Sequence, residues 1–321
     1  MMYPKPLAYA VKHKDEQVRK NSRSGGIFTA LSDAILEQGG AVYGCILSED
    51  FRAVHVRAVD KQQRNAMRGS KYLQSELGFM FRQVREDLTA GLPVLFSGTS
   101  CQIAGLKSYL GKDYPQLICV DLVCHGVPSQ LVWQKYLQWQ ENRIGSKIKS
   151  IDFRNKQDFG WKSHVESLFM DDGKQVDSKV FATIFGTGVS MRPSCYHCPY
   201  KDVMHPGDIT IADFWGIDQA VPGFNDNKGV SLVLVNNEAG ANLLDKVRDR
   251  LLIHETRLED SMQPRLRSPF PKPANRDKFW QDFHRLDFDS IAKKYGGTGI
   301  YARIRSFLRS VKRGIKAKIS Q

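Results

Sequence analysis

Short apolar runs alternate with stretches of helical spacing through the first half of the chain. The runs predict strands, and the spaced stretches predict helices. The predicted strands cover residues 41–47, 53–59, 93–96 and 117–123. The predicted helices cover residues 27–38, 77–89, 102–110 and 129–141. Alternation of this kind predicts a largely parallel, buried sheet.

The second half has a different pattern, in which strands outnumber helices. Strands are predicted over residues 147–153, 164–170, 175–181, 208–214 and 230–235. One helix is predicted over 239–252, and four prolines within 264–273 indicate an extended connector. The predicted fold class is α/β to α+β, with a mainly parallel sheet core in the N-terminal half and a mixed α+β C-terminal half. The predicted domains are residues 1–145, residues 146–260, and a connector with a basic tail over 261–321.

The composition is that of a globular protein. Of the 321 residues, 41% are hydrophobic and 25% are charged, which argues against disorder and against a fibrous repeat. Residues 88–106 carry no charge, but Gly91, Pro93 and several polar side chains interrupt them, which argues against a spanning helix. Residues 1–20 have no apolar core, so no signal peptide is predicted and the expected location is the cytoplasm.

Positive charge is concentrated near the C-terminus. The formal net charge is +13, yet nine Lys and Arg residues and no acid follow Asp289, and without these nine the net charge is +4. Apolar residues between 300 and 319 recur at spacings of three and four, which is typical of a basic amphipathic helix on an anionic membrane surface, here the inner face. Docking on the protein's own core or on an acidic partner gives the same pattern. The near balance elsewhere and the lack of a stacking-aromatic motif argue against nucleic acid.

The six cysteines fall into two groups. Cys45 and Cys119 lie inside apolar runs and are expected to be small buried residues of strands. The other four lie at element ends: Cys101, Cys124, Cys195 and Cys198. Four thiolates suit either a zinc ion or an iron–sulfur cluster, and their number does not separate the two. Two of them come singly from strand ends rather than from compact knuckles, which favours a cluster.

Two glycine-containing segments are candidates for binding phosphate. Ser24, Gly25 and Gly26 precede a predicted helix, whose first amides and dipole favour an anion. A simple helix cap gives the same pattern. Residues 68–72 place two cations, a hydroxyl and an aromatic ring around Gly69, which suits a pyrophosphate and a stacked ring, although exposed loops also have this composition.

Six motifs follow one another along the chain: Ser24-Gly25-Gly26-Ile27-Phe28, Arg68-Gly69-Ser70-Lys71-Tyr72, Gly98-Thr99-Ser100-Cys101-Gln102, Cys124-His125-Gly126-Val127-Pro128, Cys195-Tyr196-His197-Cys198-Pro199 and the run from Gly207 to Gly216. In this order they resemble the coenzyme F420 hydrogenase/dehydrogenase beta-subunit family, over about residues 8–236. There are two departures. No cysteine precedes Cys45, so the sequence resembles a short form without the ferredoxin-like module of many members, and Ser100 stands where the family usually has proline.

The resemblance implies FAD, one 4Fe-4S cluster and electron transfer between a two-electron carrier and one-electron partners, with some members found among polysaccharide-biosynthesis functions. It assigns the FAD phosphates to Ser24, Gly25 and Gly26, the flavin border to Arg68, Ser70 and Lys71, and the cluster to the four cysteines at element ends. Asp213 and Trp215 would line the site, although Trp215 is equally well explained as core. His125 would tune the cluster or carry a proton, and a structural hydrogen bond explains it equally well. Lys71 and His125 are therefore the catalytic candidates.

The expected function is an FAD- and 4Fe-4S-dependent oxidoreductase with a redox partner protein or a small-molecule electron donor, and coenzyme F420 is a candidate substrate. The alternative is a binding or scaffold protein with a structural zinc site of four cysteines and no turnover.

Overall fold

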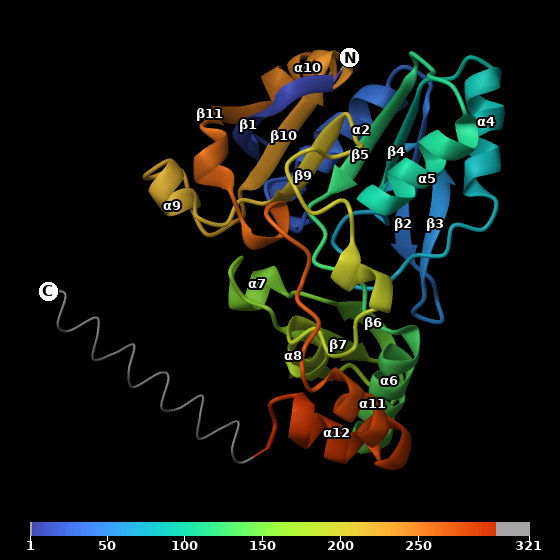
Figure 1. Cartoon of the computed structure of the whole chain (residues 1–321), viewed down its shortest axis with the longest axis vertical. Helices are drawn as coiled ribbons and strands as arrows, with labels where there is room; N and C mark the ends of the chain where they lie inside the picture. Colours follow the sequence, from blue (N-terminus) through green and yellow to red (C-terminus); the bar gives the residue numbers. More distant parts are fainter. Residues whose placement is uncertain (1, 300–321) are drawn as a thin grey trace, which may run out of the picture. The chain divides into compact units, whose positions relative to one another are not determined.

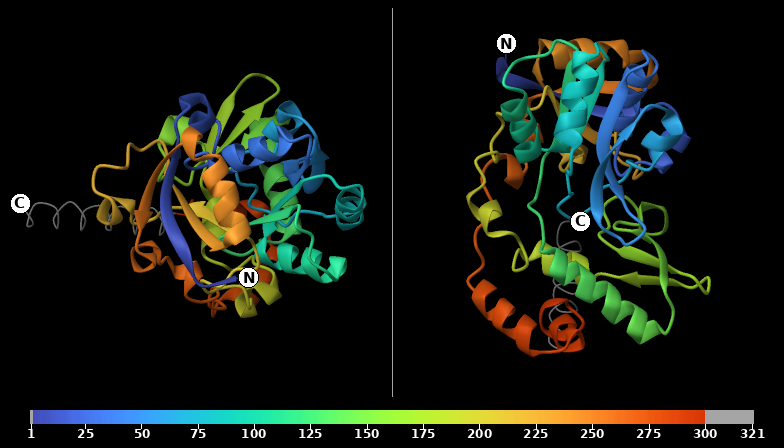
Figure 2. Two further views of the ribbon diagram at one scale, coloured as in Figure 1. Left: turned by 90° about the horizontal axis from the view of Figure 1, so that it is seen from above. Right: turned by 90° about the vertical axis from the view of Figure 1, so that its right-hand side faces the viewer.

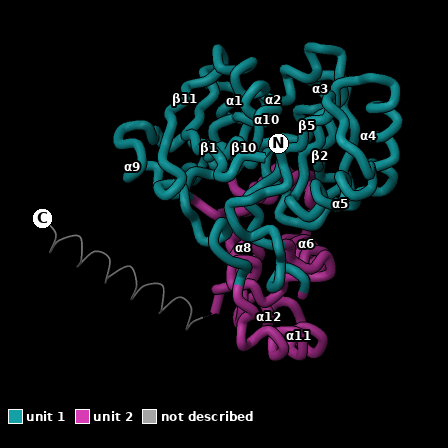
Figure 3. The backbone as a smooth tube through the Cα atoms, turned by 45° about the horizontal axis from the view of Figure 1, so that its top comes forward, with its two compact units in different colours: residues 1–126, 156–162, 194–270 teal, residues 127–155, 163–193, 271–321 magenta. Residues whose placement is uncertain are grey.

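A computed structural model of the chain describes residues 2–299 and divides it into two compact units. Unit 1 contains residues 1–126, 156–162 and 194–270, and unit 2 contains residues 127–155, 163–193 and 271–321 (Figure 3). The chain therefore passes several times between the units, whereas the sequence predicts consecutive domains. The predicted basic helix over 300–319 lies outside the described residues.

Unit 1 is built on an eight-stranded sheet. Its spatial order is β11 (Leu251–Thr256), β1 (Met2–His13), β10 (Ser231–Asn237), β9 (Ile209–Asp213), β5 (Leu117–Leu122), β4 (Val94–Thr99), β2 (Ala41–Leu47) and β3 (Ala53–Ala58). The four strands β9, β5, β4 and β2 are parallel, and the remaining pairs are antiparallel. The dark blue β1 lies between the orange strands of the late chain (Figures 1 and 2).

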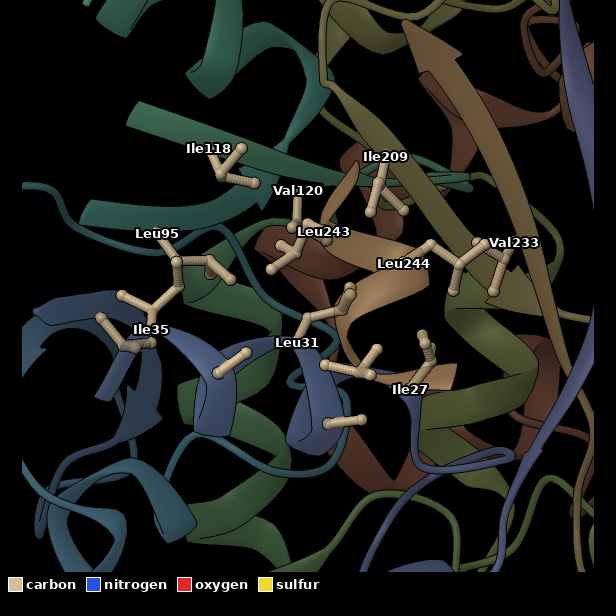
Figure 4. Packing of buried hydrophobic residues seen from close by; sticks show 14 of the residues in the cluster. Ile27, Leu31, Ile35, Leu95, Ile118, Val120, Ile209, Val233, Leu243 and Leu244 are labelled. Carbon is tan, nitrogen blue, oxygen red and sulfur yellow. The ribbon is translucent and has the colours of Figure 1, made fainter. Parts of the chain in front are cut away.

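Helices cover both faces of this sheet. Alternate strand residues face opposite sides. Val42, Leu95, Val120 and Val233 pack against α2 (Ile27–Leu36) and α10 (Glu238–Lys246) (Figure 4). Tyr43, Phe96 and Cys119 belong to a second cluster with α4 (Met80–Thr89) and α5 (Ser100–Leu110). The central strands β4 and β5 are mostly apolar because both faces are buried, whereas the edge strand β11 carries exposed polar residues.

The remaining elements of unit 1 are short. They are α1 (Glu16–Lys20), α3 (Lys61–Asn65), α7 (Lys156–Phe159), α9 (Ile217–Ala220), and the 3-10 turns η2 (Arg248–Arg250), η3 (Leu258–Ser261) and η4 (Pro264–Leu266). The 3-10 turn η1 (Pro193–His197) begins at the last residue of a unit 2 segment.

In the described residues, unit 2 combines a small antiparallel sheet with four helices. The sheet has the order β6 (Ile148–Asp152), β7 (Glu166–Met170) and β8 (Gln175–Ser178), and the helices are α6 (Gln130–Ile144), α8 (Val180–Gly186), α11 (Arg276–Arg285) and α12 (Phe288–Tyr295). Aromatic rings fill its core, with Trp133 4.6 Å from Phe181 and 4.9 Å from Phe153 between ring centroids.

The fold class is confirmed: the structure combines α/β and α+β features around a large sheet with a parallel centre. Several details differ from the prediction. Residues 2–13 form β1, where no strand was expected. The strand expected over 175–181 ends at Ser178, because the buried Glu166 carboxylate accepts the amide N–H groups of Phe181 and Ala182 and starts α8 there. The helix expected over 239–252 ends at Lys246, and 251–256 pair with β1 instead. The connector region continues into α11 and α12.

Within residues 2–299, no helix has the length and apolar character needed to cross a membrane.

Candidate functional site

The predicted site residues of unit 1 gather at one edge of its large sheet. The parallel strands β4, β5 and β9 end side by side there, since Thr99 pairs with Leu122 and Leu122 pairs with Ile211. The antiparallel β10 begins at the same edge and β1 ends at it, as shown by the pairs Ser231 with Asp213 and Val11 with Ser231. Carboxyl ends of parallel strands are the usual ligand side of such sheets.

The glycine turn, residues 24–26, connects α1 to the start of α2 at this edge. A Cβ atom on Gly25 would lie 2.1 Å from the Val11 carbonyl oxygen and 2.7 Å from the Ser231 nitrogen, so only glycine fits between β1 and β10. The Gly25 amide donates to Ser231 Oγ at 2.9 Å, and Ser24 Oγ donates to the Val230 carbonyl at 2.7 Å. These two groups therefore hold the turn in place within the protein.

Gly26 has a φ of 93° and precedes α2, which has no side-chain cap. The groups that this turn offers to an anion are thus the first amides of α2, rather than the Ser24 hydroxyl or the Gly25 amide. The structure brings Arg68 towards the same place. Burial is the main cause that lowers the pKa of His13, and the Arg250 and Arg68 charges lower it further. A Cβ on Gly26 would lie 3.0 Å from the His13 Cβ, so Arg68 and Gly26 both neighbour His13.

Arg68 carries a buried Nε atom without a hydrogen-bond partner in the described part of the chain. Burial lowers the pKa of its guanidinium, which means that its charge is poorly solvated. An anion at the α2 N-terminus would accept a hydrogen bond from Arg68 Nε and would neutralise the guanidinium charge. Ser70, by contrast, is exposed.

Lys71 is partly buried and tied to its own loop. Its Nζ donates to the carbonyl oxygens of Ala66 and Arg68, each at 2.9 Å. Burial lowers the pKa of Lys71 to about 8, and Cys45 acts in the opposite direction. Burial raises the pKa of Cys45, and the Lys71 charge lowers it. Lys71 therefore lies near the Cys45 thiol, in a place where its ammonium group is easily deprotonated.

Asp213, at the end of β9, orients an aromatic pair. Trp161 Nε1 donates to Asp213 Oδ1 at 2.9 Å, and the Trp161 and Trp215 rings stack with centroids 5.2 Å apart and an interplanar angle of 15°. Trp161 is completely buried, whereas Trp215 is partly exposed. Sequence analysis singled out Asp213 and Trp215 but missed Trp161, which lies 52 residues from its carboxylate partner and in no recognisable motif.

The thiol site is the group Cys101, Cys124, Cys195 and Cys198. Cys101 is exposed on the first turn of α5, and its Sγ is 3.2 Å from Thr99 Oγ1. Burial is the main cause that raises the pKa of Cys124, and the charges of Cys101 and Cys195 raise it further. These three thiols are thus near one another, as predicted for Cys101 and Cys124 from the two strand ends. Cys198 follows η1, three residues after Cys195.

A buried cation accompanies the thiols. Lys201 is 5% exposed, and its Nζ has no hydrogen-bond partner in the residues that the structure describes. Its charge lowers the pKa of Cys124, so it lies near that sulfur. A buried ammonium group needs a counter-charge, and thiolates would supply it. The donor set and its surroundings therefore fit a negatively charged metal–thiolate centre.

The thiols are not arranged as a closed single-metal site. Within residues 2–299, no three His, Cys, Asp or Glu side chains are close enough to hold one metal ion. Tetrahedral zinc with bonds of about 2.3 Å draws its sulfur ligands to about 3.8 Å from one another. A cluster binds each thiolate to a different iron and needs wider spacing.

His125, which follows Cys124, makes an edge contact with Phe270 at 5.0 Å between ring centroids. Arg265 lies over the other ring of this pair, 5.2 Å from the Phe270 centroid. The structure thus places His125 beside the thiol site, in contact with an aromatic ring of residues 264–273. Cys119 is completely buried in β5, as predicted, and burial strongly raises the pKa of its thiol.

A buried polar group near the thiols was missed by sequence analysis, which named Ser100 but neither His205 nor Asp121 as its partners. His205 Nδ1 is 3.0 Å from Asp121 Oδ2 and 3.1 Å from Ser100 Oγ, and all three side chains are buried. The sequence offers no local signal for this group, because its members are far apart along the chain.

Comparison with known proteins identifies the family of the chain. The model of a family described as the C-terminal part of the coenzyme F420 hydrogenase/dehydrogenase beta subunit matches residues 92–261, more than half of the chain. The chain therefore belongs to the coenzyme F420 hydrogenase/dehydrogenase beta-subunit family, a class of oxidoreductase subunits, and the predicted resemblance is confirmed.

The fold is also similar to that of a chain in the xenon-derivatised F420-reducing NiFe hydrogenase complex from Methanosarcina barkeri. The TM-score is 0.54 and the sequence identity 19%, over 79% of this chain and 84% of that one. At this identity the likeness concerns the fold. No curated protein sequence matches the chain.

Proposed function

We propose that this protein is an FAD- and 4Fe-4S-dependent oxidoreductase that passes electrons between a two-electron donor, such as a reduced deazaflavin of the coenzyme F420 type, and a one-electron or small-molecule acceptor. The observation that carries the proposal is the buried ammonium group of Lys201 beside the thiols, which has no hydrogen-bond partner in the part of the chain that the structure describes. Family membership supports it. The similar M. barkeri chain belongs to an F420-reducing hydrogenase complex, which favours a redox partner protein for this chain as well.

In this proposal Cys101, Cys124, Cys195 and Cys198 bind the cluster, and Lys201 offsets part of its negative charge. Cys101 and Cys195 both raise the pKa of Cys124, which means that these three sulfurs lie near one another. The exposed position of Cys101 would keep this centre close to the surface, where a partner can approach. His125 is the candidate for tuning the cluster or for carrying a proton near it.

FAD would bind with its phosphates at the amides of α2 and at Arg68, and with its ring bordered by Ser70, Lys71 and Asp213. Ser24 and Gly25 hold the glycine turn in place for this contact. A flavin supplies the exchange of either one or two electrons, which a cluster alone cannot provide. The Lys71 ammonium would stabilise negative charge on the reduced ring, and its two carbonyl contacts would fix its position.

Anaerobic purification tests the proposal. The protein should be yellow-brown and contain one FAD, four iron atoms and four acid-labile sulfides per chain. A screen of reductants, including reduced F420, should then identify the donor by bleaching of the flavin absorbance. A colourless protein with one zinc per chain would instead support the scaffold alternative.

The acceptor is proposed to be a saccharide intermediate of polymer synthesis, on the basis of the resemblance alone. The basic segment after residue 300 would then attach the protein to a membrane that carries lipid-linked intermediates, because each basic residue near an anionic surface contributes about 1 kcal/mol. Sedimentation with anionic vesicles at low and high salt tests this. Replacing Lys312, Arg313 and Lys316 together by glutamine should reduce binding at low salt, and unchanged binding would contradict the attachment.

A further inference from the structure

The buried imidazole of His205 joins three segments of unit 1. Its Nδ1 atom is 3.0 Å from Asp121 Oδ2 on β5 and 3.1 Å from Ser100 Oγ at the start of α5. His205 is 2% exposed, Ser100 3% and Asp121 0%. Water therefore does not replace these contacts if one partner is lost.

Each joined segment carries part of the thiol site. Ser100 directly precedes Cys101, Asp121 lies three residues before Cys124, and His205 lies seven residues after Cys198. We propose that His205 is the positioning residue of the thiol site: it fixes the first turn of α5, the end of β5 and the segment after Cys198 at the mutual distance that the four thiols need to bind one cluster. This inference rests on the proposed function.

Backbone contacts show why the His205 side chain is needed for the connection to α5 and not for the connection to β5. The segment after His205 is already attached to β5, since the Asp208 amide donates to the Cys119 carbonyl and the Cys119 amide donates to Asp208 Oδ2. Gly207 also packs tightly there, because a Cβ at this position would lie 3.0 Å from the Asp121 carboxyl group. The start of α5 is tied to β5 through the β4 ladder, in which Thr99 pairs with Leu122, but in the described residues it has no backbone hydrogen bond to the segment after Cys198. The contact of His205 with Ser100 supplies that connection.

Both contacts are made by one ring nitrogen, Nδ1, so two substitutions can distinguish them from the rest of the ring. Nδ1 lies within hydrogen-bond distance of both oxygens, while Nε2 has no hydrogen-bond partner in the described residues. The amide nitrogen of asparagine can occupy the place of Nδ1, whereas that of glutamine reaches the place of Nε2. His205→Asn should therefore retain the contacts and His205→Gln should lose them.

The experiment compares the full-length wild-type protein with His205→Asn, His205→Gln and Ser100→Ala. The measurements are iron content, the electron paramagnetic resonance spectrum of the reduced protein, and the rate of iron loss to a ferrous chelator. His205→Gln should lose iron about 10-fold faster or more, the usual effect of removing a partner that orients metal ligands. His205→Asn should behave like wild type, and FAD content should be unchanged in both. His254→Ala, an exposed histidine on β11, is the matched control.

Ser100→Ala covers the case in which His205→Gln fails to fold, because it removes one contact without leaving the Asp121 carboxylate unpaired. It should speed iron loss and change the spectrum. Wild-type rates and spectra in both Ser100→Ala and His205→Gln would overturn the inference.

A second measurement separates this inference from the proposed function. If the wild-type protein contains FAD but no iron, the cluster is refuted. Hydrogen exchange at residues 101–103 then decides whether His205 holds the segments together. Faster exchange in His205→Gln than in His205→Asn supports that positioning, and equal exchange overturns it.

Discussion

The glycine turn and the thiol site lie at the same edge of one sheet but are held in different ways. The glycine turn is fixed by backbone packing, with Gly25 pressed between Val11 and Ser231 and its amide already hydrogen-bonded. At the thiol site the contacts are between side chains, those of His205 with Ser100 and Asp121, and the Lys201 ammonium has no hydrogen-bond partner among residues 2–299. Native proteins satisfy nearly all of their buried polar groups, so an unsatisfied one indicates a missing partner. The glycine turn is therefore preformed, whereas the proposed metal centre would supply the negative charge that the Lys201 ammonium lacks at the thiol site.

The largest expected effect comes from breaking the packing of the glycine turn. Gly25→Ala places a methyl group 2.1 Å from a carbonyl oxygen, so β1 and β10 must separate. We expect a loss of about 3 kcal/mol or more in the free energy of unfolding, with loss of FAD and iron together. Urea denaturation measures it.

Gly105→Ala on α5 is the matched control for this substitution. A Cβ there meets only Phe81, at an ordinary 3.5 Å, so the free energy of unfolding should rise or change by less than about 1 kcal/mol. Equal stability of the two variants would show that the glycine turn is not held by packing.

The second prediction concerns the thiol site. Replacing Cys101, Cys124, Cys195 or Cys198 singly by serine should remove the visible absorbance of the cluster and most of the iron, with little loss of fold, because these side chains lie at element ends. Cys45→Ser and Cys119→Ser should keep the iron. The assignment is wrong if iron depends on Cys45 or Cys119 and not on one of the four.

How far the sequence predicts these regions depends on whether the signal is local. Cys101 and Cys124 could be placed at one edge because each follows an apolar run that forms a strand. His205 could not be found, since Ser100 and Asp121 lie 105 and 84 residues away. The same reason applies to the fold. The parallel strands were predicted from their own composition, whereas β11 depends on pairing with β1, 238 to 248 residues away, and α8 depends on Glu166.

The roles of the glycine turn were predicted only in part. A helix start after Ser24-Gly25-Gly26 was correctly expected, and Gly26 indeed has a positive φ. The close approach of β10 to Gly25 could not be foreseen, because it depends on a strand from the other end of unit 1. Phosphate binding by this turn stays a prediction.

The third prediction concerns the buried charge of Lys201, which is found at the thiol site and not at the glycine turn. Lys201→Met should stabilise the metal-free protein, because it removes a buried charge without a partner. It should also lower the reduction potential of the cluster by roughly 60 mV, a tenfold change in a one-electron equilibrium, because a nearby cation favours the more negative reduced state. Lys201→Arg keeps the charge and should keep the potential. A Lys201→Met protein with unchanged potential would place Lys201 outside the site.

The smallest expected effect concerns the region proposed to bind the flavin. There Lys71 should make the free energy of unfolding depend on pH. Its pKa is about 8 in the folded protein, below the ordinary value of 10.5, so between these values the unfolded chain binds more protons. Stability from this group therefore increases as pH rises from about 8 to about 10.5 and is constant below that window. Urea denaturation of wild type and Lys71→Met from pH 7 to 10 should show a difference in unfolding free energy that shifts in favour of wild type as pH rises. Ser70→Ala, on the same loop but without a titrating group, should leave the profile unchanged. A difference between wild type and Lys71→Met that is independent of pH would mean that the ammonium is solvated, and Lys71 would then not be the desolvated cation proposed to border the flavin.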